Sequence, residues 1–212
     1  MRMLNLKALL IKIPTALANW LRKRMQGANR PGFKGNRHRL PRRVHTLAAI
    51  EQDLLKTCGI QGIILDLDNT IVSEDDRYVS PRAEAWIAQA KLAGFRFFIL
   101  SNGKRPYRVR YWSHRLDIPA INPAKKPFPY AFRKAIAKMQ VNPKQVVVIG
   151  DGVHTDVLGA WISGCCSIQV ATLPHPLRWW EKIAGKWVQT PYPVGDELWD
   201  FDDSTAKYDG KS

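Results

Sequence analysis

The chain has 212 residues, of which 45% are hydrophobic and 24% are charged, a composition that excludes disorder throughout and indicates a globular protein. Lysine and arginine outnumber aspartate and glutamate by 33 to 18, which gives a formal net charge of +15. No apolar run reaches the ~20 residues of a membrane-spanning helix, and the three cysteines, Cys58, Cys165 and Cys166, form neither a disulfide framework nor a zinc-binding spacing.

The amino-terminal end carries most of the basic charge. Residues 1–45 contain 12 basic residues and no acidic one. Within 3–25, leucines and other apolar residues recur at helical spacing between lysines and arginines, and Pro14 predicts a kink or the start of a second short helix. Residues 27–43 are rich in glycine, proline and arginine, which favours a linker. We therefore assign 1–43 to a basic amphipathic arm.

Helices and strands are predicted to alternate from Val44 onward. The expected helices cover 46–57, 80–92, 105–116, 127–139 and 154–163, and the expected strands cover 61–66, 95–100, 119–122, 145–151 and 165–171. Strands that alternate with helices imply right-handed crossovers and a mostly parallel sheet with helices on both faces. The sequence therefore predicts a Rossmann-like α/β domain over residues 44–172.

The last segment, residues 173–212, is predicted to be a carboxy-terminal extension. Trp179, Trp180 and Trp187 lie among basic residues in its first half, and acidic residues dominate from Asp196 onward. The acidic part is expected to be a solvated tail.

Polar residues follow or precede the predicted elements at one end of the sheet. Four groups stand out: Asp66 with Asp68, Ser101 with Asn102, Lys125 with Lys126, and Asp151. The carboxyl ends of adjacent parallel strands meet at one edge of a sheet, where ligands bind. Carboxylates that lie close together repel each other, and burial adds to the cost. A hard divalent cation with oxygen ligands relieves both the repulsion and the cost of burial. Mg²⁺ is the usual choice where phosphate is also bound.

Four motifs at these positions resemble those of the haloacid dehalogenase (HAD) superfamily of phosphohydrolases. They are, in the family's order and spacing, DLDNTIV (66–72), LSNG (100–103), AKKP (124–127) and GDGVHTD (150–156). The resemblance covers about 45–172, some 60% of the chain. It is closest to the capless phosphatases of subfamily IIIA, among them the phosphatidylglycerophosphate phosphatases.

The resemblance implies the chemistry of the three aspartates that follow the strands. By it, Asp66 is the nucleophile and forms an aspartyl-phosphate. Asp68 protonates the leaving oxygen and then activates the hydrolytic water. Asp66, the backbone carbonyl of Asp68 and the side chain of Asp151 would hold Mg²⁺, which neutralises charge between nucleophile and phosphate.

The resemblance also implies roles for the remaining matched residues. Ser101 and the backbone N–H groups near Asn102 would bind phosphoryl oxygens. Lys126, which directly precedes the proline of its motif, would bind phosphate and balance the negative charge of the transfer. Thr70 and Asp156 are expected to orient the site, Asp156 by contact with Lys126 or with water on the metal.

Family members select substrates largely through a cap domain inserted after the first motif or between the second and third. The gaps here, 73–80 and 104–124, are too short for a cap. An open site fits a bulky phosphomonoester, and the resemblance favours phosphatidylglycerophosphate, cleaved to phosphatidylglycerol and phosphate.

The arm favours action at a membrane. An apolar helical face beside lysines and arginines is typical of an interfacial helix, each basic residue adds ~1 kcal/mol of attraction to anionic lipid, and tryptophan favours the headgroup level. We therefore expect a cytoplasmic protein that is peripheral on the membrane.

Other interpretations of the arm remain open. A basic arm also binds nucleic acid through counterion release. This would suit a soluble phosphatase acting on nucleotides, nucleic-acid ends or phosphoproteins, or a low-activity phosphate-binding module docked on RNA or the ribosome. The arm helix could also simply pack on the domain or on a partner.

Overall fold

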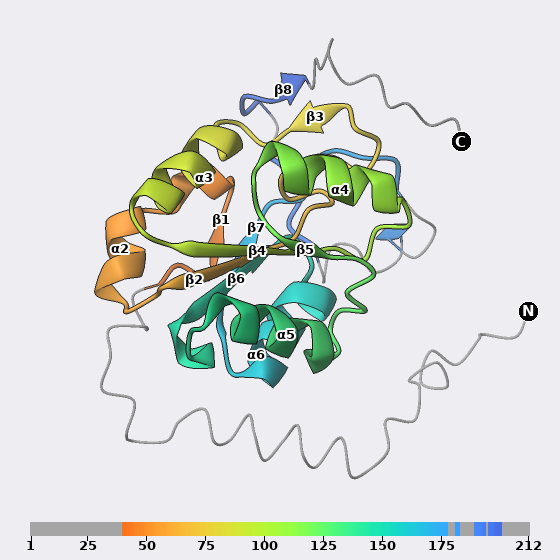
Figure 1. The fold of residues 1–212 in the computed structure, drawn as a ribbon. Helices are drawn as coiled ribbons and strands as arrows, with labels where there is room; N and C mark the ends of the chain where they lie inside the picture. Colours follow the sequence, from red (N-terminus) through yellow and green to blue (C-terminus); the bar gives the residue numbers. More distant parts are fainter. Residues whose placement is uncertain (1–39, 178–180, 183–188, 194, 201–212) are drawn as a thin grey trace, which may run out of the picture. The chain divides into compact units, whose positions relative to one another are not determined.

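The computed structural model describes residues 40–177, 181–182, 189–193 and 195–200 (Figure 1). Their central feature is a sheet of six parallel strands. In spatial order these are β1 (Arg43–Val44), β7 (Cys166–Val170), β6 (Val146–Gly150), β2 (Gly62–Leu65), β4 (Arg96–Leu100) and β5 (Ala120–Ile121). The predicted Rossmann-like parallel sheet is thereby confirmed.

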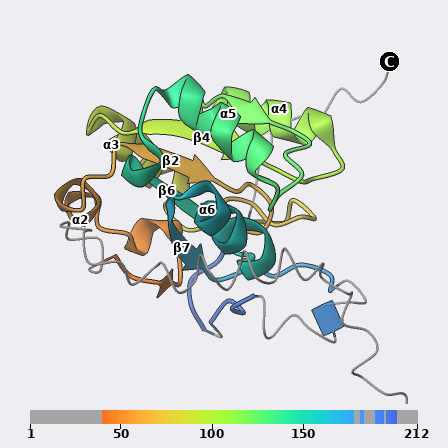
Figure 2. The same cartoon turned by 90° about the horizontal axis from the view of Figure 1, so that it is seen from below.

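Helices cover both faces of the sheet (Figure 1). On one face lie α2 (Gln52–Thr57), α3 (Ala83–Leu92) and α4 (Pro106–Arg115), and on the other lie α5 (Pro129–Met139) and α6 (Leu158–Ser163). The view from below shows α5 over β4 and β2, and α6 toward β6 and β7 (Figure 2). The sheet is therefore the middle of three layers.

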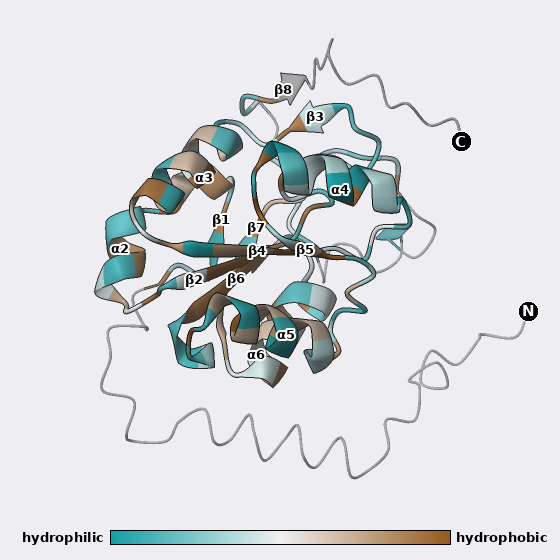
Figure 3. Ribbon diagram, viewed as in Figure 1, coloured by the Kyte–Doolittle hydropathy of each residue, from teal (hydrophilic) through white to brown (hydrophobic). Residues whose placement is uncertain are grey.

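The strands are apolar almost throughout because both of their faces are covered. Alternate residues of β2 enter two separate cores: Ile63 and Leu65 pack with the helices of one face, and Ile64 packs with α5 and α6 on the other. The hydropathy colouring shows hydrophobic strands between helices with mixed surfaces (Figure 3).

The helix predicted at 46–57 is interrupted. A 3-10 turn at Leu47–Ala49 precedes α2, and Ile50 and Glu51 between them are extended. The carbonyl of Ile50 accepts a hydrogen bond of 2.7 Å from Nε1–H of Trp86, a contact with α3 that replaces helical bonding at this point.

Three other helix starts also differ from the prediction. The helix expected from 127 begins at Pro129, because Phe128 precedes a proline and so stays extended. The helix expected from 80 begins at Ala83, after a turn in which Ala83 N–H donates to Ser80 O. The helix expected from 154 opens with a π turn at Val153–Val157, in which Gly152 O accepts from Val157 N–H.

The described part of the carboxy-terminal segment returns to the domain. Thr172 N–H donates to Thr190 O at 2.7 Å, and β8 (Trp199–Asp200) pairs antiparallel with β3 (Tyr78–Val79). At the other end, β1 begins at Arg43, inside the predicted linker, and extends the sheet beside β7.

Neither point at which a cap was considered holds an added domain. Between β2 and α3 the chain has a turn and the short β3, and between β4 and α5 it has only α4 and β5. No helix among the described residues is long and apolar enough to cross a bilayer. The predicted arm helix at 3–25, the three tryptophans at 179–187 and the acidic tail beyond Asp200 lie outside the described residues.

Candidate active site

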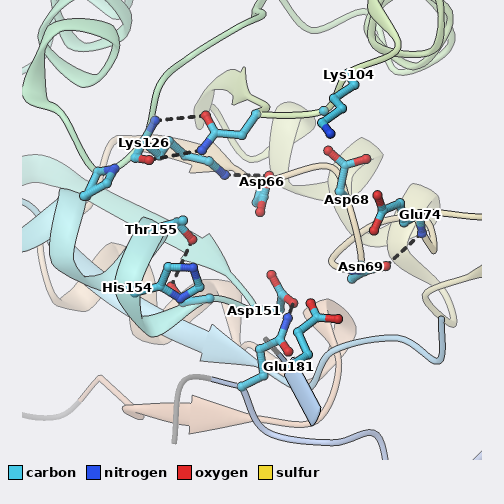
Figure 4. Close-up of a pocket in the computed structure, with 15 residues that line it drawn as sticks. Asp66, Asp68, Asn69, Glu74, Lys104, Lys126, Asp151, His154, Thr155 and Glu181 are labelled. Carbon is cyan, nitrogen blue, oxygen red and sulfur yellow. Dashed lines mark hydrogen bonds and ion pairs between the residues drawn. The ribbon is translucent and has the colours of Figure 1, made fainter. Parts of the chain in front are cut away.

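The candidate site lies at the carboxyl edge of the sheet, where β2, β4 and β6 end. Loops after these strands, with parts of the carboxy-terminal segment, line a cavity of about 870 Å³ (Figure 4). The register of the sheet aligns the strand ends: Leu65 of β2 is level with Ile149 of β6, and Asp66 N–H continues the ladder by donating to Ile149 O at 2.9 Å. Asp66 and Asp151 therefore emerge side by side.

Lys126 joins the predicted nucleophile to Asp156. Its Nζ lies 2.6 Å from Oδ1 of Asp66 and 2.7 Å from Oδ1 of Asp156. All three side chains are buried. Asp66 Oδ1 also accepts the N–H of Leu67 at 2.7 Å. The nucleophile's carboxylate is therefore held from two directions through one oxygen.

The side chain of Asn102 places Lys126. Its Oδ1 accepts the Lys126 N–H at 2.9 Å, and its Nδ2 donates to the Lys126 carbonyl at 3.1 Å. The neighbouring Lys125 is exposed and has a positive φ of 53°. Of the two lysines, the structure turns Lys126 into the site.

Three carboxylates crowd this point. Oxygens of Asp66, Asp151 and Asp156 all lie within 4.8 Å of one another. Burial and the nearby charge of Asp156 raise the pKa of Asp66 well above its ordinary value, and the same two causes raise the pKa of Asp151 to about 6. Burial alone would lower the pKa of Lys126, but Asp156 and Asp66 stabilise its ammonium and raise that pKa instead.

The carboxylates fit a divalent cation. Both oxygens of Asp156 are already bonded, Oδ1 to Lys126 and Oδ2 to the Thr155 hydroxyl at 2.8 Å, so Asp156 fits the expected orienting role. Asp66 and Asp151 are left as ligands. Buried carboxylates with raised pKa values are the donors that a hard cation binds and keeps ionised.

A glycine allows this arrangement. Asp156 packs so closely over Gly150 that a Cβ at Gly150 would overlap its side chain. Position 150 therefore has to be glycine, because Asp156 of the same motif packs directly against it.

Asp68 and Ser101 bind each other. The Ser101 hydroxyl donates to Oδ2 of Asp68 at 2.9 Å and accepts the N–H of Gly103 at 2.9 Å. Ser101 is fully buried and does not line the cavity, whereas Asp68, Asn102 and Gly103 do. Its hydroxyl bonds to Asp68, and the expected contact of Ser101 with a phosphoryl oxygen stays a prediction. Thr70 is also buried outside the lining, and its hydroxyl has no hydrogen-bond partner within the described part of the chain.

Arg108 contacts the expected acid/base residue and was not predicted from the sequence. Arg108 is 2% exposed; its Nη1 forms an ion pair with Asp68, its Nε pairs with Asp76, and its Nη2 donates to Ser73 O at 2.7 Å. No sequence pattern singled out Arg108, because Arg105, Arg110 and Arg115 lie in or beside the same helix.

Two residues from the carboxy-terminal segment were also missed. Gln189 Nε2 donates to Oδ2 of Asp151 at 3.0 Å, and the buried Glu181 lines the cavity near Asp151 (Figure 4). No local pattern marks either position, because their place depends on the return of the segment to the sheet. From within the sheet, Gln169 Nε2 donates to the Asp151 backbone carbonyl at 2.8 Å.

The arrangement suits nucleophilic attack by a carboxylate. Asp66 is held beside an ammonium group, and Asp68, two residues later, lines the same cavity. A covalent catalyst with an adjacent acid/base group and a positively charged partner is the arrangement that phosphoryl transfer through an acyl phosphate needs.

Comparisons with known proteins point to one family. A family model described as haloacid dehalogenase-like hydrolase matches residues 34–161, and another described as HAD-hydrolase-like matches residues 123–200. A protein of Bacillus subtilis (strain 168) named "Probable phosphatase YqeG" is 39% identical over 127 residues, which cover 60% of this chain and 73% of that protein.

Two solved structures are similar to part of the chain. The cobalt-bound deoxy-D-mannose-octulosonate 8-phosphate phosphatase of Haemophilus influenzae has 21% identity and a TM-score of 0.46, over 55% of this chain and 69% of its own. The D,D-heptose 1,7-bisphosphate phosphatase of B. bronchiseptica has 22% identity and a TM-score of 0.44, over 53% of this chain and 82% of its own.

Proposed function

The chain belongs to the haloacid dehalogenase-like hydrolases and is a phosphatase, and from that premise we propose that it uses Mg²⁺ to dephosphorylate phosphatidylglycerophosphate at a membrane surface. The observation that carries the chemistry is the bridge from Lys126 to Asp66 and Asp156 at the ends of β2 and β6. The lipid substrate is supported by the open site, the basic amphipathic arm and the family resemblance.

In the first step, an oxygen of Asp66 attacks phosphorus and the bond from phosphorus to the substrate's ester oxygen breaks. Asp68 gives its proton to the departing oxygen, so phosphatidylglycerol leaves with a hydroxyl group in place of the ester oxygen. Lys126 stays within ion-pair distance of Asp66 Oδ1 and offsets negative charge near the phosphoryl group.

In the second step, Asp68 takes a proton from water, whose oxygen attacks phosphorus and displaces the Asp66 carboxylate. Inorganic phosphate leaves and both aspartates return to their starting states. Mg²⁺ held by Asp66, Asp151 and the backbone carbonyl of Asp68 would supply neutralisation of the charge between nucleophile and phosphate.

The open site supports a large substrate. Neither insertion point carries a cap, so the cavity is bounded by short loops and by the carboxy-terminal segment. A phosphomonoester at the end of a lipid headgroup can enter such a cavity while its acyl chains remain in the bilayer. The arm's interfacial composition would keep the enzyme at that surface.

The test is Mg²⁺-dependent phosphate release from phosphatidylglycerophosphate in mixed micelles, beside a soluble aryl phosphate. Asp66→Asn is the inactive blank, and Lys126→Gln is paired with Lys125→Gln as a matched control. We expect fast release from the lipid, slow release from the aryl phosphate, loss in Lys126→Gln and no loss in Lys125→Gln. Activity on the aryl phosphate alone would remove the lipid assignment, and no activity on either would favour a phosphate-binding module.

Removal of the arm distinguishes the interpretation that it binds a membrane from the interpretation that it binds nucleic acid. The deletion should cover residues 1–39, because Arg43 belongs to β1 and its loss would damage the sheet. We expect the deletion to reduce binding to anionic vesicles. A loss of RNA binding with unchanged vesicle binding would favour the nucleic-acid interpretation instead.

A further inference from the structure

Basic charge within the domain is concentrated in one segment. Residues 101–139 contain ten lysines and arginines and a single acidic residue, Asp117. The segment begins directly after β4 and ends with α5, and it includes Lys126. Arg105, Arg108, Arg115 and Lys126 pair with carboxylates, whereas Lys104 and Lys125 are exposed beside the cavity and supply unneutralised positive charge there.

Exposed aromatic side chains lie in the same segment. Tyr107 is 47% exposed, Phe128 is 68% exposed and Tyr130 is 73% exposed. Tyr107 is the second residue of α4 and Tyr130 is the second residue of α5. A helix that follows a parallel strand begins at the carboxyl edge of the sheet. Both tyrosines therefore lie at the end of the domain that holds the cavity.

Hydrogen bonds hold the two loops of this segment together beside the cavity. Asn102 bonds to the backbone of Lys126, and Asn122 Nδ2 donates to the carbonyl of Gly103 at 2.7 Å. Lys104 from the first loop and Pro127 from the second line the cavity, and Phe128 follows Pro127 directly. Phe128 therefore lies next to the cavity lining, and the two tyrosines lie at the same end of the domain.

We propose that this surface docks on a bilayer of anionic phospholipid and so brings a headgroup phosphate to the cavity. We call it the aromatic–basic rim and define it by its exposed residues Lys104, Tyr107, Lys125, Phe128, Tyr130 and Lys134. Aromatic rings favour the headgroup level, and cationic side chains near the surface are attracted to anionic lipid. The inference rests on the proposed lipid substrate and names the part of the domain that meets it.

The placement of the aromatic rings favours lipid over nucleic acid. Proteins that bind single strands without sequence preference stack the bases on aromatic residues along a basic groove. Here Tyr107, Phe128 and Tyr130 are absent from the lining of the cavity and stand outside it. Rings that project from the rim suit insertion among headgroups.

The test uses the full chain, so that the arm is the same in every protein. The rim variant is Phe128→Ser with Tyr130→Ser. The matched control is Leu92→Ser, since Leu92 is 90% exposed at the end of α3, just before β4 begins and so at the opposite edge of the sheet. Binding is measured by co-sedimentation with vesicles of phosphatidylglycerol and phosphatidylcholine, and with vesicles of phosphatidylcholine alone.

We expect the rim variant to bind the anionic vesicles about tenfold or more weakly, while Leu92→Ser binds like the natural sequence. Hydrolysis of the soluble aryl phosphate should be unchanged in both, which shows that the domain is folded. Unchanged vesicle binding in the rim variant overturns the proposal, and so does a loss confined to binding of single-stranded RNA.

Failure of the proposed docking surface can be distinguished from failure of the proposed lipid substrate. If the natural sequence fails to hydrolyse the phospholipid but rim-dependent vesicle binding is found, the substrate assignment fails and the docking surface stands. If the phospholipid is hydrolysed equally well by the rim variant in vesicles and binding is unchanged, the docking surface fails and the substrate assignment stands.

Discussion

Replacement of Arg108 by methionine tests whether this buried cation supports both the fold and Asp68, the proposed acid/base residue. Arg108 pairs with Asp68 and Asp76 and donates to the carbonyl of Ser73, so the variant removes the shared partner of two carboxylates and one peptide group. Methionine keeps much of the length and the apolar stem, which limits the loss of packing.

The size of the effect follows from burial. Removal of one member of a buried ion pair typically costs about 3–5 kcal/mol. The side chains of Asp68 and Asp76 are 18% and 16% exposed, so water relieves part of the charge left behind. We therefore expect the free energy of unfolding to fall by about 3 kcal/mol, the lower end of that range. Loss of the contact that orients Asp68 should also lower kcat by about 10²-fold.

Urea unfolding measures the first quantity and aryl phosphate hydrolysis measures the second, at a temperature where the variant is folded. Arg110→Met, an exposed arginine on the same helix, is the control and should change stability by less than about 0.5 kcal/mol. Asp76→Asn alone and combined with Arg108→Met completes a cycle whose coupling should exceed about 1 kcal/mol. A loss below about 1 kcal/mol in Arg108→Met, or full activity, would refute the reasoning.

Three further predictions concern the metal-binding carboxylates and the packing of α5. Gln189→Ala should weaken Mg²⁺ binding about 10-fold, measured calorimetrically, because Asp151 loses the donor that orients it; equal affinity would contradict this. Without metal, burial and the charge of Asp156 raise the pKa of Asp151 to about 6 in the folded protein, above its ordinary value of about 4 in the unfolded chain. The free energy of unfolding should therefore fall as pH rises through this window, by up to about 3 kcal/mol for this residue, and Asp151→Asn should lack that part of the fall. Gly159→Ala should lower the free energy of unfolding by about 1–3 kcal/mol, because the added Cβ would overlap the buried ring of Phe132. Thermal unfolding measures this, and an unchanged midpoint would show that the packing of α6 against α5 accommodates the extra methyl group.

The parts of the site that the sequence predicted are those set by local pattern and parallel topology. Asp66 and Asp151 each follow an apolar strand, and the rule that parallel strands end at one edge was enough to bring them together. The start of α5 at Pro129 was also readable, since a residue before proline avoids helical geometry, but the earlier Pro127 was taken as the first residue.

The parts that the sequence did not predict depend on contacts between distant segments. Arg108 contacts Asp68 across 40 positions of the chain, and Gln189 contacts Asp151 across 38. Neither pair has a spacing that reflects helix or strand periodicity. The break before α2 has the same origin, because it depends on the contact from Trp86 in a later helix to the carbonyl of Ile50.

The contact from Gln189 to Asp151 also has a consequence for the order of events during protein synthesis. All strands of the main sheet are outside the ribosome tunnel once Val170 has emerged, so the sheet can form while the residues that follow are still inside the tunnel. Asp151 gains its side-chain donor only after Gln189 has emerged from the ribosome tunnel. The sheet can therefore fold before the candidate metal site is complete, and a nascent chain from which Val170 but not Gln189 has emerged would hold a folded sheet with Asp151 still lacking this donor.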